Sequence, residues 1–180
     1  LDKFGGAAAA YSVRQLKTPR KEKKLLDAYT GASAAYGLRK LRGNYTGATI
    51  CVRRSSDNTE KDIGFINKGE LDLDALLDHC SIYDGFVTKW YDQSGNSKDA
   101  SNSTATYQPK IVSSGSTIMS NNKPALDWTT VGTNLDNYSL AWGTVTSQSV
   151  FIIATPSNVS LNSSHPYMRI LSISNDSSTD

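Results

Sequence analysis

The chain has 180 residues, of which 38% are hydrophobic and 20% are charged, so it can bury one sizeable core but hardly two. No apolar run reaches transmembrane or signal-peptide length, and the formal net charge is only +2. We therefore expect neither a membrane nor a nucleic-acid partner. The first residue is Leu1 and not Met, which leaves secretion open.

A short repeat opens the chain. Gly6 to Lys17 reads GAAAAYSVRQLK and Gly31 to Arg42 reads GASAAYGLRKLR, and the basic run KTPRKEKK lies between them at residues 17–24. Small residues before a Tyr favour one or two helical turns with a close-packed alanine face. We expect short N-terminal helices, a basic connecting segment over residues 1–30 and a single domain over residues 31–180.

From Thr49 onward, short β-branched or aromatic runs alternate with turn residues, as antiparallel strands do. LDLDALLDHC, residues 71–80, is the exception: its leucines and acids predict one amphipathic helix with Asp72 and Asp74 near the N-terminus. We expect the apolar run SVFIIAT to lie in the middle of a sheet. The predicted strands are ATICVRR (48–54), IGFI (63–66), GFVTKWYD (85–92), PKIV (109–112), STIM (116–119), PALDW (124–128), SVFIIAT (149–155) and MRILSI (168–173).

Many short strands with little helix predict a mainly β fold, an antiparallel β-sandwich or jelly roll. The strands counted above would leave open sheet edges. We therefore expect the domain to be incomplete at its C-terminal end.

The residues that most often carry catalysis or ligate metals stand in no motif. Cys51 and Cys80 have no zinc-type spacing, and either one disulfide or two buried thiols fits them. No Ser has the surroundings of a hydrolase nucleophile, and we expect His79 and His165 to be surface or cap residues. Glycoside hydrolysis needs two carboxylates, but none has an assignable role, so we predict no catalytic residue and no cofactor. The carboxylates considered are Asp57, Asp62, Glu70, Asp72, Asp74, Asp84, Asp92, Asp127 and Asp136.

The densest polar stretch is VTKWYDQSGNSKD, residues 87–99. Its oxygen ligands could hold calcium, although an EF-hand register is missing, and we predict no metal site. A turn at Gly95 that Asp92 and Asn96 cap is the structural alternative. One of Trp90 and Tyr91 should be buried and the other partly exposed, since neighbours on a strand face opposite sides. Carbohydrate binding is possible here, because sugar rings stack on aromatic rings, and the predicted contacts are Trp90, Tyr91, Asp92 and Asn96.

Four segments together resemble a known family: CVRRSSDNTEKDIGF, DGFVTKWYDQSGN, QPKIV and NNKPALDW. They are similar in order and spacing to the N-terminal part of the catalytic domain of fungal α-L-arabinofuranosidase B, which implies a concanavalin A-like jelly roll. The resemblance covers about residues 31–175 and transfers no catalytic residue, because that family's catalytic carboxylates lie further toward the C-terminus. The lead-in at Ala34 to Arg42 also resembles segments of bacteriophage tail and virion proteins.

From the lead-in and the lack of an assignable active site, we expect a structural component of a phage virion. It would be a tail fibre or tail-associated protein with a carbohydrate- or receptor-binding role. Its partners would be other virion subunits, a second copy of itself in a homo-oligomer and a host surface glycan, and its location the virion. The alternative is a secreted arabinofuranosidase-like glycosidase or a carbohydrate-binding module.

Overall fold

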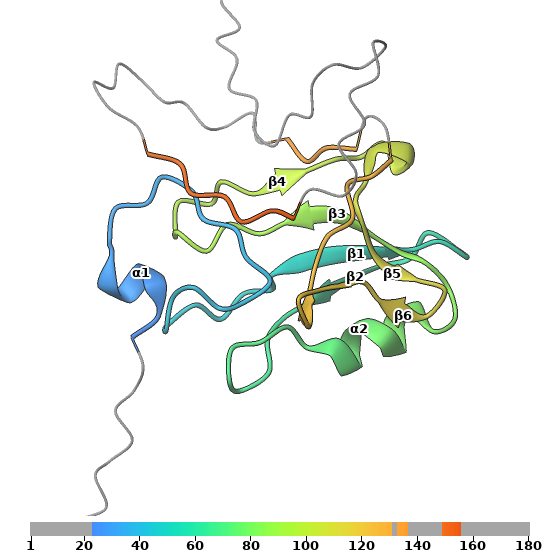
Figure 1. Cartoon of the computed structure of the whole chain (residues 1–180), viewed down its shortest axis with the longest axis horizontal. Coiled ribbons are helices and arrows are strands. Elements are labelled where there is room, and N and C mark those ends of the chain that lie inside the picture. The colour runs from blue at the N-terminus through green and yellow to red at the C-terminus, as the bar shows by residue number, and fades with distance from the viewer. Residues whose placement is uncertain (1–22, 131–132, 137–148, 156–180) are drawn as a thin grey trace, which may run out of the picture.

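The computed structural model describes residues 23–130, 133–136 and 149–155. Its main sheet is antiparallel, in the order β2-β1-β3-β5-β6, with β4 also paired to β3 (Figure 1). These strands are β1 (Ile50–Arg54), β2 (Glu60–Ile63), β3 (Gly85–Trp90), β4 (Ala100–Ser101), β5 (Lys110–Ser113) and β6 (Ser116–Thr117). A separate hairpin joins β7 (Met119–Ser120) to β8 (Lys123–Pro124). The predicted mainly β, antiparallel architecture is confirmed, and it is consistent with a sandwich or jelly roll.

One face of the sheet packs against helix α2 (Leu73–Cys80). The predicted amphipathic helix is confirmed: Leu76 and Cys80 are fully buried, and the Asp72 carboxylate caps the helix by accepting from Ala75 N at 3.0 Å. Full burial of a leucine such as Leu76 stabilises the fold by roughly 1.5–3 kcal/mol. The buried core consists of Ile50, Val52, Ile63, Leu71, Leu76, Cys80, Val87, Ile111 and Val112.

Cys51 and Cys80 are both buried and both free. Cys80 lies on the helix side of the sheet, since a Cβ added to Gly85 would lie 2.6 Å from its Sγ and 3.2 Å from a Val52 methyl group. Cys51 precedes Val52 on β1 and therefore faces the opposite side. Its Sγ lies 3.5 Å from a carboxylate oxygen of Glu60. The sheet thus separates the two thiols, and the disulfide that the sequence left open is not formed.

The predicted helix over residues 31–42 is wrong. This segment has no regular structure, and its backbone groups bond to side chains of the turn after β3 instead of to each other. The only helix that the structure describes before β1 is α1 (Leu25–Ala28), and the first copy of the repeat lies outside the described residues. The predicted boundary between residues 30 and 31 stays a prediction.

The placement of SVFIIAT in the middle of a sheet is also wrong. Residues 149–155 form no strand, and Phe151 and Ile153 are 95% and 104% exposed. Apolarity and β-branching favour a strand only where a neighbouring strand supplies backbone partners. The predicted strand MRILSI lies outside the part of the chain that the structure describes.

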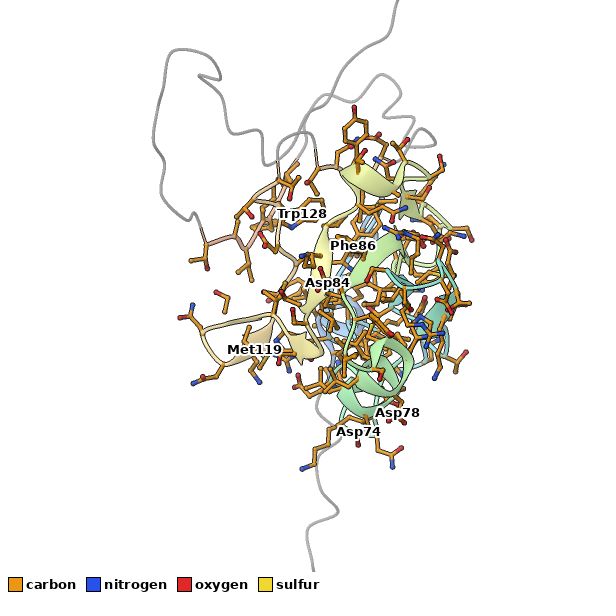
Figure 2. The ribbon with its side chains drawn as sticks, turned by 90° about the vertical axis from the view of Figure 1, so that its right-hand side faces the viewer. Asp74, Asp78, Asp84, Phe86, Met119 and Trp128 are labelled. Carbon is orange, nitrogen blue, oxygen red and sulfur yellow. The ribbon has the colours of Figure 1, made fainter. Side chains whose placement is uncertain are left out.

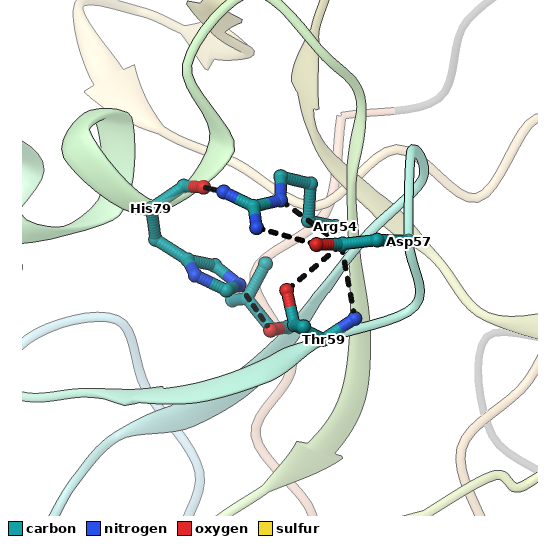
Figure 3. Close-up of polar contacts among 5 residues, drawn as sticks. Arg54, Asp57, Thr59 and His79 are labelled. Carbon is teal, nitrogen blue, oxygen red and sulfur yellow. Dashed lines mark hydrogen bonds and ion pairs between the residues drawn. The ribbon is translucent and has the colours of Figure 1, made fainter.

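We expected His79 to be a surface or cap residue; it lies in the last turn of α2 and is buried. Its Nε2 donates to the carbonyl of Val52 at 2.9 Å, and its own carbonyl accepts from Arg54 (Figure 3). The Arg54 guanidinium also donates two hydrogen bonds to Asp57, and Thr59 donates to the same carboxylate. The bonds from Arg54, and then those from Thr59, hold the pKa of Asp57 well below its usual range. This network joins the β1–β2 hairpin to the end of α2, so we give His79 a structural role. His165 lies outside the described residues.

We expected no membrane partner from the sequence. Among the described residues, no helix is long and apolar enough to span a bilayer.

Candidate functional site

Three of the four predicted carbohydrate contacts, Tyr91, Asp92 and Asn96, lie in the turn after β3, residues 91–96. The fourth, Trp90, is the last residue of β3. Asp92 is buried and accepts four hydrogen bonds. Oδ1 accepts from the backbone N–H groups of Ala35 and Ser94, both at 2.8 Å, and Oδ2 accepts from Ser94 Oγ and Lys98 N. Burial raises the pKa of Asp92, but these hydrogen bonds outweigh it and the pKa is lowered. The carboxylate is committed to the turn and the lead-in, and this favours an architectural role.

Gln93 has no exposed surface and binds the lead-in as a strand partner would. Its Oε1 accepts from Leu41 N at 2.7 Å, while its Nε2 donates to the carbonyls of Gly37 at 2.8 Å and Arg39 at 3.0 Å. Its backbone N–H donates to the carbonyl of Ala35. From the sequence, the Gln93 side chain was only one of the oxygen ligands that could hold calcium in residues 87–99. Its role depends on residues more than 50 positions earlier, which no local pattern could reveal.

Asn96 is exposed, and its amide donates to the carbonyls of Ala32 and Ser33. Gly95 is the sharp point of the turn with φ +94°, and an added Cβ would lie 2.6 Å from Nη1 of Arg42. Arg42 donates to the carbonyl of Ser94. The predicted turn at Gly95 is thus present. Asp92 caps it directly, whereas the Asn96 side chain joins it to Ala32 and Ser33, just before the lead-in.

Trp90 lies on the core side of the sheet, where its register partner on β1 is the buried Ile50. Its ring centroid lies 5.9 Å from that of Tyr36. The indole Nε1 is buried and finds no hydrogen-bond acceptor among the residues that are described. A sugar on the outer face of the sheet would not reach this ring.

Tyr91 follows β3 on the outer side of the sheet and is half-buried. Its hydroxyl donates to Asp62 Oδ1 at 2.8 Å, and the Lys89 ammonium lies 5.3 Å from its ring centroid. Burial, and then the hydrogen bond to Asp62, raises the pKa of Tyr91. Asp62 itself is exposed. Tyr91 and Asp62 therefore place an aromatic ring and a solvent-facing carboxylate side by side.

Sequence analysis gave Asp62 no role. The register shows why: Asp62 of β2 and Lys89 of β3 both pair with Cys51 of the strand between them. The sequence placed the strand at IGFI (63–66) and Asp62 in the turn before it, whereas β2 spans Glu60–Ile63. It also could not show that β1 lies between β2 and β3. Only that pairing brings Asp62 to Tyr91.

The same outer face continues toward β5 through Phe86. The Arg53 guanidinium carbon and the Lys110 ammonium lie 4.9 Å and 5.3 Å from its ring centroid. Lys110 also pairs with Asp84 at 2.8 Å, and Figure 2 labels Phe86 and Asp84 next to each other in that view. Arg53 and Lys110 already bind protein groups. The Asp62 carboxylate, in contrast, is exposed to solvent and receives the bond from Tyr91 at one of its oxygens.

The acidic, histidine and cysteine side chains that the structure describes do not gather into a metal-binding cluster. Within the described residues no group of three or more His, Cys, Asp or Glu side chains could hold a metal ion. The calcium alternative for the turn would need the Asp92 oxygens, which backbone and hydroxyl donors already occupy. The arrangement can instead bind polyhydroxylated molecules, through stacking on an aromatic ring and acceptance of hydroxyl protons by a carboxylate.

Comparison with known proteins finds a family model over most of the described chain. The model described as "Alpha-L-arabinofuranosidase B, catalytic" matches residues 26–144. No curated protein matches.

Solved structures of arabinofuranosidases match with low similarity. One, soaked with a cyclic sulfate inhibitor, is 24% identical with a TM-score of 0.43, and the match covers 49% of this chain and 21% of that one. Another, in complex with arabinofuranosyl-alpha-1,2-xylobiose, is 26% identical with a TM-score of 0.40, and the match covers 51% and 20%. The chain thus spans about a fifth of the length of these proteins.

The expectation of a phage tail fibre or other virion component is wrong. The lead-in at Ala34 to Arg42, which suggested it, falls within the family match to a glycosidase catalytic domain. Its residues also have a structural explanation, because Ala35, Gly37, Arg39, Leu41 and Arg42 all bond to the turn after β3.

Proposed function

The chain belongs to the family of the α-L-arabinofuranosidase B catalytic domain, and on that premise we propose that it forms part of a glycosidase that releases α-L-arabinofuranosyl groups. The observation that carries the proposal is the family match over residues 26–144. The chain spans only about a fifth of the length of the matched structures. We therefore propose the activity for the full-length protein and not for these 180 residues alone.

The outer face around Tyr91 is our proposed sugar contact. A half-buried tyrosine offers a flat apolar surface for the C–H face of a sugar ring, and the exposed Asp62 carboxylate can accept hydrogen bonds from sugar hydroxyls. Asn96 is exposed, but its amide is bonded to the carbonyls of Ala32 and Ser33. Of the four predicted contacts, Trp90 and Asp92 would support the site from inside, while Tyr91 would touch the sugar.

We propose a binding role for the face around Tyr91, and we assign no acid–base role to Asp57, Asp84 or Asp92. Hydrolysis with an oxocarbenium-like transition state needs one carboxyl group as acid and a second as base or nucleophile. Asp57 is paired with Arg54, Asp84 with Lys110, and Asp92 accepts four hydrogen bonds. Such partners favour the ionised form, which suits neither a general acid nor a mobile base.

We also propose that the protein acts outside the cell, as the secreted alternative requires. A polysaccharide that carries arabinofuranosyl groups is too large to cross a membrane, so an enzyme that trims it must meet it outside. The homo-oligomer stays a prediction.

Release of 4-nitrophenol from 4-nitrophenyl α-L-arabinofuranoside by the full-length protein tests the activity. Tyr91→Ala should raise KM on the order of tenfold with little change in kcat, because it removes a stacked ring from both ground and transition state. Tyr83→Ala is the matched control: Tyr83 is a 43% exposed tyrosine on the loop after α2, and its loss should leave KM unchanged.

Two results would count against the proposal. Absence of 4-nitrophenol release would overturn hydrolysis, and retained affinity for arabinosides in that case would favour the carbohydrate-binding alternative. Equal KM values for wild type and Tyr91→Ala would overturn the sugar contact alone.

A further inference from the structure

Two Asn-x-Thr or Asn-x-Ser sequences lie within the described residues, and their asparagines have very different surroundings. Asn44-Tyr45-Thr46 lies in the loop before β1, and Asn102-Ser103-Thr104 follows β4. Such sequences accept N-linked glycans in the eukaryotic secretory pathway. Whether a glycan is compatible with the folded chain depends on what each asparagine amide already does.

The Asn44 side chain is exposed, and no hydrogen bond joins it to any residue that the structure describes. The middle residue of the sequon is anchored: Tyr45 Oη donates to the carbonyl of Ala48 at 2.7 Å, and its ring packs edge-on against Phe65. Thr46, like Asn44, is exposed. Anchoring of the tyrosine therefore leaves the asparagine and the threonine on either side of it in solvent.

The Asn102 amide, in contrast, is part of the structure. Its Nδ2 donates to the backbone and side-chain oxygens of Asn134 at 3.1 and 2.8 Å, and its Oδ1 accepts from Thr104 N at 2.8 Å. Its backbone bonds to Thr88 and to the side chain of the buried Gln108. A glycan on Nδ2 would remove at least one of the bonds to Asn134 and force the loops apart.

We infer that Asn44, and not Asn102, accepts an N-linked glycan when this chain passes through a eukaryotic secretory pathway, an inference that rests on the extracellular location proposed above. In the reaction, the amide nitrogen of Asn44 bonds to the anomeric carbon of an oligosaccharide carried on a lipid diphosphate. The lipid diphosphate leaves, and the amide nitrogen loses one proton. The glycan would project from the loop before β1 without replacing any contact of the fold.

The test is secretion of the full chain, behind an added signal peptide, from a eukaryotic host. Trypsin separates the two sites, since residues 43–53 carry only Asn44 and residues 99–110 carry only Asn102. Treatment with peptide N-glycosidase in heavy-oxygen water marks each asparagine that had a glycan. Asn44 should be marked in most of the secreted, folded chains and Asn102 in almost none.

Two variants control for the sequon itself. Thr46→Ala destroys the first sequon and should abolish the mark at Asn44 with little loss of stability, because Thr46 is exposed. Thr104→Ala destroys the second but keeps the backbone N–H that bonds Asn102, and should leave the glycan pattern unchanged. An unmarked Asn44 in the wild type, or a marked Asn102 in folded chains, would overturn the inference. Hydrolytic activity plays no part in this readout, so failure of the proposed function would not be mistaken for failure here.

Discussion

The side-chain Oε1 of Gln93 accepts a 2.7 Å hydrogen bond from the backbone N–H of Leu41, although 52 positions separate the two residues. The same amide donates to the carbonyls of Gly37 and Arg39. One fully buried side chain thus satisfies three backbone groups of a segment that has no regular structure of its own. Buried backbone groups need hydrogen-bond partners. Gln93 supplies them to the lead-in, as a neighbouring strand supplies them within a sheet.

Replacement of Gln93 by methionine, which has a similar shape, should therefore destabilise the chain by about 3 kcal/mol or more, because three backbone groups lose their partner. Urea unfolding measures the change. Trypsin should also cut faster after Arg39, Lys40 or Arg42 in the variant. Asn96→Ala is the control: its bonds to Ala32 and Ser33 are exposed, and we expect a loss below about 1 kcal/mol. Equal losses in the two variants would contradict this role.

Ser81 ends α2 in a strained conformation. It has φ 53° and ψ −126°, and Tyr83 N donates to Cys80 O across it at 3.0 Å, which is the geometry of a type II′ turn with its glycine position filled by serine. Ser81→Gly should stabilise the chain by about 1 kcal/mol through relief of this strain.

Gly115, which lies against the same turn, provides a control in which substitution should lower the stability instead of raising it. It has φ +74°, and an added Cβ would lie 2.7 Å from the carbonyl oxygen of Ser81. Gly115→Ala should therefore destabilise. Thermal unfolding of both variants beside the wild type tests the pair, and a lower melting temperature for Ser81→Gly would show that the turn is not strained.

Gly85 opens β3 against the end of α2. An added Cβ would lie 2.6 Å from Cys80 Sγ and 3.2 Å from atoms of Val52 and Val112. Gly85→Ala should destabilise by about 1–3 kcal/mol, the usual cost of overpacking. In the double variant with Cys80→Ala the two changes should compensate in part, since removal of the sulfur makes room for the methyl group. Strictly additive free energies of unfolding in this double-mutant cycle would mean that the two groups do not clash.

The Cys51 thiol should make stability fall at high pH. Burial, and then the nearby Glu60 and Asp62 carboxylates, outweigh a hydrogen bond from Thr88 and raise the pKa of Cys51 to about 11. Because the folded pKa lies above the unfolded one, this contribution to stability is complete below about pH 9 and is lost as pH rises toward 11. Urea midpoints across that range should fall less in Cys51→Ala than in the wild type.

The other groups with raised pKa values, the side chains of Tyr45, Cys80 and Tyr91, should leave part of this pH dependence in the variant. Alkylation provides an independent check. Iodoacetamide should modify Cys51 slowly near pH 8 in the folded chain and rapidly in urea. Fast modification of the folded chain at that pH, or identical pH profiles for the two proteins, would contradict the raised pKa.

The sequence by itself determined the elements whose causes are local. Leucine spacing and the Asp72 cap predicted α2, β-branched runs predicted β1, β3 and β5, and Gly95 marked the turn after β3. These features depend on interactions within a few positions, which a pattern of residues records. The family resemblance rested on the same segments and led to the correct domain family.

Only the tertiary structure decided the rest, because the deciding partners lie far apart in the sequence. The lead-in reads as a helix but has no regular structure, because Asp92 and Gln93 bind its backbone groups. SVFIIAT reads as a central strand but pairs with no strand in the described chain. His79 reads as a surface residue but is buried by its bond to Val52. Asp62 acquires a role only when β1 pairs with both β2 and β3 and brings its carboxylate to the hydroxyl of Tyr91. Burial and hydrogen-bond satisfaction depend on the packing of the whole sheet, and no local pattern contains that information.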